Sequence, residues 1–241
     1  MVLHMKHFNH IFNILYIICF CLSVLALTKQ LALYRTLPTV TSSISDLPSD
    51  SSALKADVKE IALTFDDGPH PVYTEELLDA LKERNITATF FVTGQNAELH
   101  PDLIKRMYDE GHLIGNHTYS HIQLTSANRD QFKKELIKTN DILRDITNEE
   151  IQYVRPPYGS WDKALETELN MFPVLWNIDP LDWCNSNPDR VAQSVIKNVS
   201  ENGIILMHDY YDSSVKAAVM VIDELTRQGY TFVTVEEILF D

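Results

Sequence analysis

The sequence is poor in cysteine, and this scarcity excludes two ways of stabilising a fold. Only three cysteines occur among its 241 residues, namely Cys19, Cys21 and Cys184. The first two lie in an apolar segment, and the third has no partner in the rest of the chain. A disulfide framework and a cysteine-based metal site are therefore excluded. The main domain must be stabilised by its hydrophobic core alone, which still permits a location outside the cytoplasm.

Basic residues are also scarce, and they form no cluster. The chain has 20 Lys and Arg against 34 Asp and Glu, which gives a formal net charge of −14. Affinity for phosphate backbones needs clustered positive charge, so we expect no nucleic-acid partner. Glycine-rich phosphate loops, internal repeats and a separate carbohydrate-binding module are absent as well. We attribute the acidity to solubility.

The N-terminal region differs in composition from the rest of the chain. The segment 11–27 is nearly all apolar, Lys6 precedes it, and no acidic residue occurs before Asp46. Lys29 could extend its long side chain to the membrane surface, which would lengthen the apolar span. We predict a short cytoplasmic N-terminus, a transmembrane signal-anchor helix and a flexible linker rich in Ser, Thr, Pro and Asp, at residues 1–10, 11–34 and 35–57.

A cleaved signal peptide is the alternative for the same segment. Its apolar core would be shorter and would end in small residues, and Val24-Leu25-Ala26 is only a passable cleavage site. We favour the uncleaved anchor. It predicts a single-pass protein of the cell membrane with its main domain outside the cytoplasm, and the alternative predicts a secreted one.

Strand and helix patterns alternate through residues 58–241. Apolar runs predict strands at 61–65, 88–92, 151–154, 174–176, 204–206 and 231–235. Helical spacing predicts helices at 73–82 and 131–146, one beginning at Asn187-Pro188, and one through 215–225 that Gly229 ends. The alternation predicts one α/β domain with a mostly parallel sheet. The pattern alone leaves open whether the sheet is flat or closed into a barrel.

Several predicted strands end in ionisable residues. Asp66 and Asp67 follow the strand 61–65, Arg155 follows 151–154, and His208 follows 204–206. Functional sites of α/β proteins gather where strands end and loops begin. A shared polar site is therefore expected at this edge.

The pair Asp66 and Asp67 needs a positive partner, because adjacent like charges repel. The segment HTYSH supplies His117 and His121, which are four residues apart, and one helical turn would bring both imidazoles to the same face. Isolated histidine pairs usually mean nothing. Two imidazoles and one carboxylate, however, form a three-ligand site for a divalent ion such as zinc. A cation bound by one aspartate would also explain how the two acids coexist.

Five segments then give the sequence a specific resemblance. They are TFDDGP at 64–69, HTYSH at 117–121, RPPYG at 155–159, DPLDW at 179–183 and ILMHD at 205–209. In this order they resemble the motifs of the polysaccharide deacetylases, the NodB-homology enzymes of carbohydrate esterase family 4. The resemblance covers residues 58–241. It implies a distorted (β/α) barrel of mostly parallel strands, and a metal-dependent deacetylase of acetylated sugars.

The resemblance also implies roles for the polar residues. Asp67, His117 and His121 would hold one divalent ion, with zinc, cobalt and nickel all suited to these donors. Asp66 would remain free as the general base that takes a proton from the attacking water. His208 would be the general acid that protonates the leaving sugar nitrogen.

Five further residues would support this chemistry. Asp182 would raise the pKa of His208, and Arg155 would pair with Asp66, although an inconsequential surface salt bridge is the alternative for Arg155. The backbone N–H of Tyr158 would help to stabilise the oxyanion. Trp183 and Leu206 would line the acetyl pocket, with a plain core position as the alternative for both.

The Asp182-Trp183 form of the fourth motif resembles that of the peptidoglycan N-acetylglucosamine deacetylases. We therefore expect a monomer that acts on an acetylated cell-wall glycan near the membrane. Chitin oligomers and acetylated xylan remain open as substrates, as do hydrolysis of other C–N bonds and a glycan-binding protein without catalysis. The sequence assigns no role to His70, Asp179 or Asp209.

Overall fold

The computed structural model describes residues 59–240. The predicted anchor at 11–34 and the predicted linker at 35–57 lie outside these residues. None of the helices in the described range is both long and apolar enough to cross a membrane.

The described residues form a seven-stranded sheet in which every pair of neighbouring strands is parallel. The strand order is β5-β4-β3-β2-β1-β6, and β7 pairs with the first half of β1. The strands are β1 (Lys59–Asp66), β2 (Thr89–Val92), β3 (Leu113–Asn116), β4 (Tyr153–Val154), β5 (Phe172–Pro173), β6 (Gly203–His208) and β7 (Tyr230–Val233). The prediction of a mostly parallel α/β sheet is confirmed.

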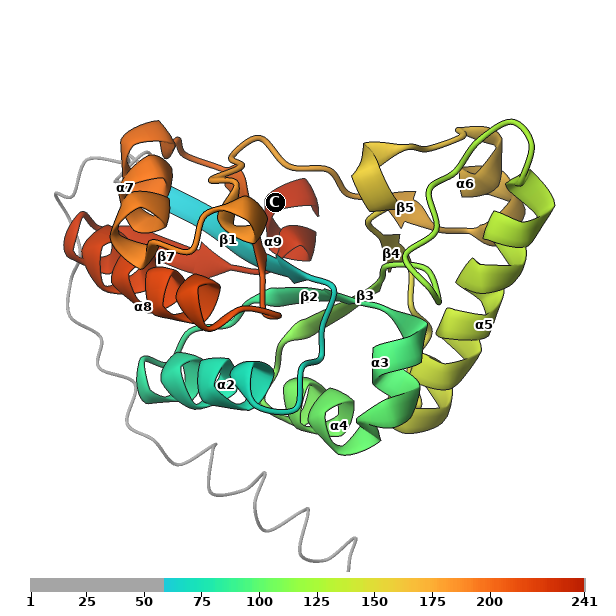
Figure 1. Ribbon diagram of the computed structural model, residues 1–241, viewed down its shortest axis with the longest axis horizontal. Coiled ribbons are helices and arrows are strands. Elements are labelled where there is room, and N and C mark those ends of the chain that lie inside the picture. The colour runs from blue at the N-terminus through green and yellow to red at the C-terminus, as the bar shows by residue number, and fades with distance from the viewer. Residues whose placement is uncertain (1–58, 241) are drawn as a thin grey trace, which may run out of the picture. The chain divides into compact units, whose positions relative to one another are not determined.

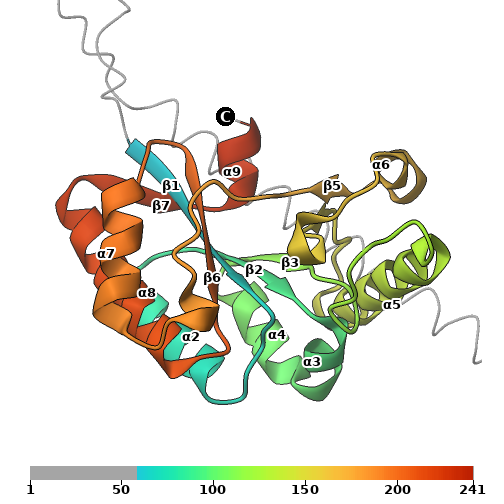
Figure 2. The same ribbon diagram turned by 45° about the horizontal axis from the view of Figure 1, so that its top comes forward.

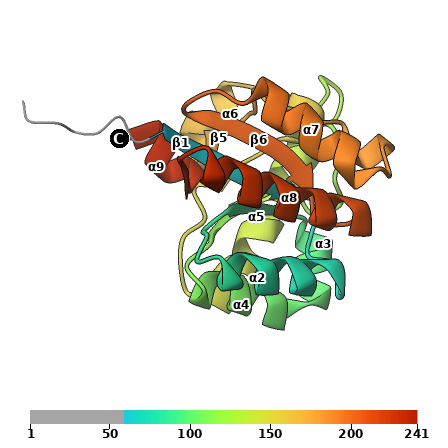
Figure 3. The ribbon, with the colours of Figure 1, turned by 90° about the vertical axis from the view of Figure 1, so that its left-hand side faces the viewer.

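Helices surround the outer side of this sheet, as Figure 1 shows. Successive contacts run from α7 through α8, α2 and α4 to α5. In Figure 3, α7 and α8 lie side by side beside β6. The helices are α2 (Tyr73–Glu83), α3 (Gly94–Leu99), α4 (Pro101–Asp109), α5 (Arg129–Thr147), α6 (Ala164–Leu169), α7 (Pro188–Asn198), α8 (Asp212–Arg227) and α9 (Val235–Phe240).

Strand β1 shows how the sequence separates the core from the site. Successive side chains of a strand point to opposite faces. Ile61, Leu63 and Phe65 join the large hydrophobic cluster shared with the surrounding helices. Thr64 and Asp66 alternate with them and are buried on the other face. The continuous apolar run is therefore typical of a strand covered on both faces, and its inner face carries polar residues.

The sheet curls into a half-barrel that is incompletely closed. Strand β5 does not pair with β6, and the chain beyond β5 reaches β6 through an isolated bridge between Ile178 and Ile205. Helix α9 packs against β1, which it approaches in Figure 2. This curled parallel arrangement agrees with the expected distorted barrel.

The predicted strand at 174–176 is wrong, because the strand in this region is β5 at Phe172–Pro173. The N–H of Val174 still donates to the carbonyl of Val154. The carbonyls of Val174 and Leu175, however, accept hydrogen bonds from the Arg155 side chain at 3.2 and 3.3 Å. The buried guanidinium thus occupies backbone carbonyls that a longer strand would use to pair with its neighbour. The pattern of apolar residues does not reveal this competition between a side chain and the backbone.

Candidate active site and metal centre

The strand ends bring the predicted polar residues to one edge of the sheet. Asp66 is the last residue of β1 and lies in register with His208, the last residue of β6. His117 follows the end of β3, and Arg155 follows the end of β4. Parallel strands therefore place at one edge side chains that are separated by up to about 140 positions in sequence.

Asp67, His117 and His121 form a cluster with metal-ligand geometry. One ligand atom from each residue lies within 4.8 Å of the other two. Nε2 of each histidine is 3.4 Å from Asp67 Oδ1. That oxygen is buried and has no hydrogen-bond partner among the described residues. A buried carboxylate oxygen between two imidazoles fits a divalent cation, which would satisfy all three groups.

His117 is oriented by the backbone of Arg155. Its Nδ1 donates a hydrogen bond to the Arg155 carbonyl at 2.6 Å. This bond fixes the ring and leaves Nε2 free to face Asp67. Such outer hydrogen bonds commonly orient histidines that bind metals.

The expectation that His117 and His121 share a helical turn is wrong. The segment 117–121 is a loop, in which Thr118 and His121 both have left-handed backbone angles with φ of 62° and 57°. The Thr118 N–H donates to the Asn116 side chain at 2.7 Å. The loop carbonyls of Thr118 and Tyr119 accept from the first N–H groups of α3. The loop thus accepts hydrogen bonds from the free N–H groups at the start of α3. It also brings both imidazoles to Asp67 without forming a helical turn.

The charges around the cluster favour an ionised Asp67. Burial would raise the pKa of Asp67, but the neighbouring His117, followed by His121 and His208, outweighs burial and lowers it. Burial also lowers the pKa of His121, against the opposing charge of Asp67. An ionised carboxylate beside a neutral imidazole is the protonation state that metal binding requires.

Asp66 has a cationic partner of its own. Arg155 Nη1 donates to Asp66 Oδ1 at 2.8 Å and to Thr64 Oγ1 at 2.6 Å. Arg155 is completely buried, and its guanidinium lies over the ring of Phe91 at 4.2 Å from the ring centre. A surface salt bridge is therefore excluded for Arg155. The two adjacent acids differ in their partners. Asp66 pairs with the buried arginine and lies 3.7 Å from His117 Nε2, whereas Asp67 lies 3.4 Å from both imidazoles.

His208, the last residue of β6, is held by Asp182. Asp182 Oδ1 is 2.8 Å from His208 Nδ1, and Asp182 Oδ2 accepts the His208 backbone N–H at 2.8 Å. Burial alone would lower the pKa of His208. The hydrogen bond and charge of Asp182, with the charges of Asp66 and Asp67, raise that pKa to about 9. A cationic imidazole at neutral pH is a suitable general acid.

These side chains open into a cavity of about 520 Å³. Leu206 is buried in β6 and Trp183 is half exposed, and both line this cavity. The ring of Tyr158 lies edge-on to His121, with 5.1 Å between ring centres. Of the ten predicted site residues, Arg155 and Asp182 are the two that do not line it, and they contact Asp66 and His208 from behind. The predicted residues on the cavity wall are Asp66, Asp67, His117, His121, Tyr158, Trp183, Leu206 and His208.

Several residues of the site had no assigned part in the sequence. Pro156, Trp176, Asp179 and Tyr211 also line the cavity. The Asp179 side chain accepts the Leu181 N–H at 2.9 Å, so it also stabilises a turn. Pro156 and Asp179 belong to recognised motifs, which was a usable signal for them. Trp176 and Tyr211 carried no signal, because only folding brings them to the site.

A third buried acid, Asp209, supports the aspartate loop. Asp209 accepts a hydrogen bond from the Thr74 hydroxyl, and the Thr74 oxygen accepts the His70 N–H at 2.7 Å. Burial raises the pKa of Asp209 to about 7. A Cβ atom built on Gly68 would lie 2.2 Å from the Asp209 carboxylate, so only glycine fits there. Asp209 thus packs directly against the loop that carries Asp66 and Asp67.

His70 stabilises the start of α2. Its Nδ1 accepts the backbone N–H groups of Val72 and Tyr73, each at 3.2 Å. The first N–H groups of a helix have no intrahelical partner, so this contact satisfies two donors near the helix start. The structure therefore gives His70 a local structural role.

Comparison with known proteins places this site in a family of carbohydrate-active hydrolases. The polysaccharide deacetylase family model matches residues 53–174. The chain is 41% identical over 182 residues to the peptidoglycan-N-acetylglucosamine deacetylase of Bacillus cereus. The match covers 73% of this chain and 66% of that relative, which is just under two thirds of its length. It is 38% identical over 170 residues to a chitooligosaccharide deacetylase of Rhizobium leguminosarum bv. trifolii, covering 69% of this chain and 78% of the relative.

Solved structures agree with the family match. The peptidoglycan deacetylase PdaC from Bacillus subtilis superposes with a TM-score of 0.73 at 39% identity. The match covers 76% of this chain and 91% of that structure. The chain therefore belongs to the polysaccharide deacetylase family.

Proposed function

We propose that this protein hydrolyses N-acetyl groups of N-acetylglucosamine residues in a cell-wall polysaccharide, with peptidoglycan as the substrate. The observation that carries the proposal is the separation of Asp66 from Asp67. Asp66 is paired with the buried Arg155, and Asp67 faces His117 and His121. One acid is thereby available as a base and the other as a ligand.

One divalent ion would be held by Asp67, His117 and His121. When bound, it supplies Lewis acidity that lowers the pKa of water and polarises an acetyl carbonyl. The donor set accepts zinc, cobalt or nickel, and we favour zinc. The remaining steps depend on side chains of the protein.

Asp66 accepts the proton of the attacking water, and Arg155 keeps the carboxylate oriented toward the cavity. The water oxygen adds to the acetyl carbonyl carbon, and the backbone N–H of Tyr158 stabilises the negative oxygen that forms. His208 then gives its proton to the sugar nitrogen while the C–N bond breaks. The products are acetate and a free amine on the sugar. Leu206 and Trp183 provide an apolar wall for the acetyl methyl group.

We also propose that the protein acts as a monomer at the outer face of the cell membrane, tethered by residues 11–34. The apolar composition of that segment and the Ser- and Pro-rich segment that follows it support this location. A short tether would restrict the enzyme to glycan close to the membrane. Secretion after signal-peptide cleavage is the alternative.

Chitooligosaccharides are the second candidate substrate, because the Rhizobium relative bears that name and aligns over most of its length. The test uses the full-length chain, stripped of metal and reloaded with one ion at a time. Peptidoglycan, chitooligosaccharides and acetyl-xylan are then offered, and acetate release is measured. We expect metal-dependent release that is fastest from peptidoglycan. Faster release from chitooligosaccharides would support the second candidate, and glycan binding without release from any substrate would contradict both.

A further inference from the structure

The two candidate histidine ligands are held in different ways. His117 is fixed through its ring, because its Nδ1 donates to the Arg155 carbonyl at 2.6 Å. The ring of His121 makes no hydrogen bond to any residue that the structure describes, although its Nε2 lies 3.4 Å from Asp67 Oδ1. Histidines that bind metals usually have an orienting bond at the second ring nitrogen. The position of His121 therefore depends more on its backbone.

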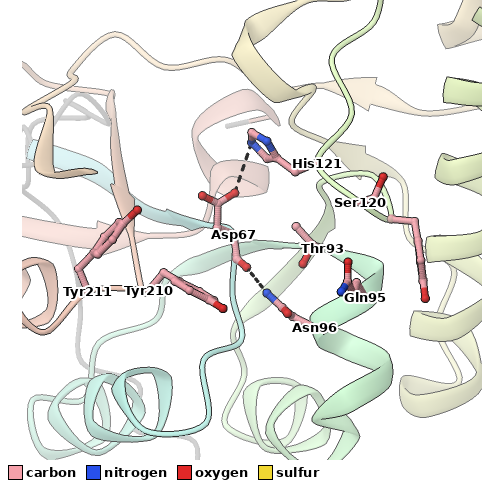
Figure 4. A pocket seen from close by; sticks show the side chains of 9 residues that line it. Asp67, Thr93, Gln95, Asn96, Ser120, His121, Tyr210 and Tyr211 are labelled. Atoms are coloured by element: carbon pink, nitrogen blue, oxygen red, sulfur yellow. Dashed lines mark hydrogen bonds and ion pairs between the residues drawn. The ribbon is translucent and has the colours of Figure 1, made fainter. Parts of the chain in front are cut away.

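The backbone of His121 is strained, with a left-handed φ of 57°. A residue with a Cβ pays free energy to adopt this conformation, and it persists only where surrounding contacts impose it. Figure 4 shows the His121 ring pointing toward Asp67, with Ser120 beside it on the same loop. A contact that fixes Ser120 should therefore also fix the ring that follows it.

Glu135 of α5 binds Ser120 twice. Its Oε2 accepts the Ser120 backbone N–H at 2.9 Å, and its Oε1 accepts the Ser120 hydroxyl at 2.8 Å. Two hydrogen bonds from one carboxylate to one residue restrain orientation as well as position, and bonds to an ionised acceptor are stronger than neutral ones. Glu135 lies outside the five motif segments and does not line the acetyl cavity. Its contact with the loop thus has no counterpart in the roles assigned so far.

Helix α5 is itself firmly placed beside this loop. Its Leu136 is fully buried in a hydrophobic cluster that includes Phe132. The Leu136 carbonyl accepts a hydrogen bond at 2.9 Å from the side chain of Asn116, the residue directly before His117. Two consecutive residues of α5 therefore bind the residues that precede the two histidines.

We propose that Glu135 is a positioning residue of the metal centre. By holding Ser120 it keeps the His121 backbone in its left-handed conformation, and so keeps the imidazole facing Asp67. This role rests on the proposed function and deepens it, because an acid that touches neither the ion nor the substrate would set part of the affinity for the ion. Without the contact, the backbone at His121 would relax and its ring would leave the position of a ligand.

The test measures the zinc affinity of the full-length chain by competition with a coloured chelator. Glu135→Ala removes both hydrogen bonds to the loop, and Ser120→Ala removes only the bond made by the hydroxyl. We expect the Kd for zinc to rise on the order of tenfold in Glu135→Ala, which is the lower end of the effect of changing the partners of metal ligands, and to rise less in Ser120→Ala.

Glu135→Gln is the conservative variant. Its amide oxygen can still accept the backbone N–H of Ser120, and its amide N–H can donate to the serine oxygen. Most of the zinc affinity should therefore return. Acetate release by Glu135→Ala should also recover as the zinc concentration is raised, whereas a general loss of structure would not be reversed in this way.

Asp145→Ala is the matched control on the same helix. Asp145 is exposed, and its side chain makes no hydrogen bond within the described part of the chain. The change removes one negative charge from α5 without altering the loop, so the Kd for zinc should equal that of the unaltered chain. Urea unfolding of the metal-free proteins shows whether each variant is folded. Ser120→Ala changes an exposed side chain, so it still tests the contact if Glu135→Ala does not fold.

The outcomes separate this role from the proposed function. If Glu135→Ala and Ser120→Ala bind zinc as tightly as the unaltered chain and acetate is still released, the positioning role is overturned and the proposed function stands. If Glu135→Ala weakens zinc binding but the unaltered chain releases no acetate from any glycan, the proposed function fails and the positioning role stands. An equal loss of affinity in Asp145→Ala or in Glu135→Gln would also overturn the positioning role. Failure of the unaltered chain to bind zinc would overturn both.

Discussion

Asp66 and Asp67 are neighbours in the chain, but their surroundings give them different chemistry. Asp66 contacts a fully buried guanidinium, and Asp67 contacts two imidazoles at 3.4 Å. We expect Asp66→Asn to lower kcat for acetate release by on the order of 10²–10⁴, because it removes the proposed general base. Zinc binding should persist in this variant. Equilibrium dialysis with metal analysis checks this, alongside an acetate assay.

Asp67→Asn is the matched control at the adjacent position. It should lose both zinc binding and activity, since it removes a ligand. If Asp66→Asn loses zinc as completely as Asp67→Asn, the division of roles between the two acids is wrong.

We predict that His208 links activity to pH through its contact with Asp182. As a general acid it must be protonated, and its pKa is raised to about 9, so activity should fall as the pH rises through its pKa. Asp182→Asn removes the negative charge that stabilises the imidazolium. We expect the alkaline fall in kcat/KM to move to lower pH, toward the ordinary histidine value of about 6.5. A pH–rate profile of the two proteins measures this shift, and identical alkaline limbs would exclude His208 as the acid.

Residue pairings of this kind were predictable only where a recognised motif supplied them. The contact of Arg155 with Asp66 followed from the family resemblance. The contact between the Thr64 hydroxyl and the Ile205 carbonyl joins residues 141 positions apart, and the contact of Asp209 with Thr74 joins residues 135 apart. Local sequence carries no signal for such pairs, because they exist only after the strands have aligned.

At the scale of elements, the loop after β1 depends on one close approach. Gly68 packs against the Asp209 carboxylate, which a Cβ would meet at 2.2 Å. We expect Gly68→Ala to destabilise the fold by roughly 1–3 kcal/mol, which is the usual cost of overpacking, and to reduce activity because the aspartates shift. Urea unfolding provides the measurement.

Gly111→Ala is the control for this prediction. A Cβ there meets no atom within 4 Å, although its φ of 84° makes any side chain mildly strained. Its effect on the free energy of unfolding should be smaller than that of Gly68→Ala. Equal effects of the two changes would show that the contact with Asp209 is unimportant.

The buried His112, just before β3, should make the free energy of unfolding depend on pH. Burial lowers its pKa to about 4, so the folded state keeps it neutral while the unfolded chain binds a proton near pH 6.5. The unfolded state thus gains protons first, and stability should fall as the pH drops from about 6.5 toward 4, by about 3 kcal/mol at most from this residue. His112→Gln should flatten this part of the profile in urea unfolding at several pH values. An unchanged slope would contradict the assignment.

Element positions were predictable where periodicity was strong. The helix predicted at 131–146 is α5 at Arg129–Thr147, and Asn187 caps α7 by accepting the Arg190 N–H at 3.0 Å. The failures occurred where side chains compete with the backbone pattern. Arg155 uses the carbonyls at 174–175, and the HTYSH segment binds the start of α3 in place of forming a helix.

At the scale of the whole molecule, the predicted anchor can be tested by cell fractionation. We expect the full-length protein to remain with the membrane fraction after carbonate washing, because an apolar helix of about 20 residues spans a bilayer. Mass spectrometry of the protein should find its N-terminal peptide intact. A soluble form that begins shortly after Ala26 would show that the segment is a cleaved signal peptide.

The central claim concerns a single cation and its three ligands. Anomalous diffraction from crystals grown with excess zinc tests it most directly. We predict one zinc ion about 2.0–2.2 Å from Asp67, His117 and His121, with Asp66 remaining on Arg155. Zinc absent from these three side chains, or coordinated by Asp66 in place of Asp67, would contradict the account.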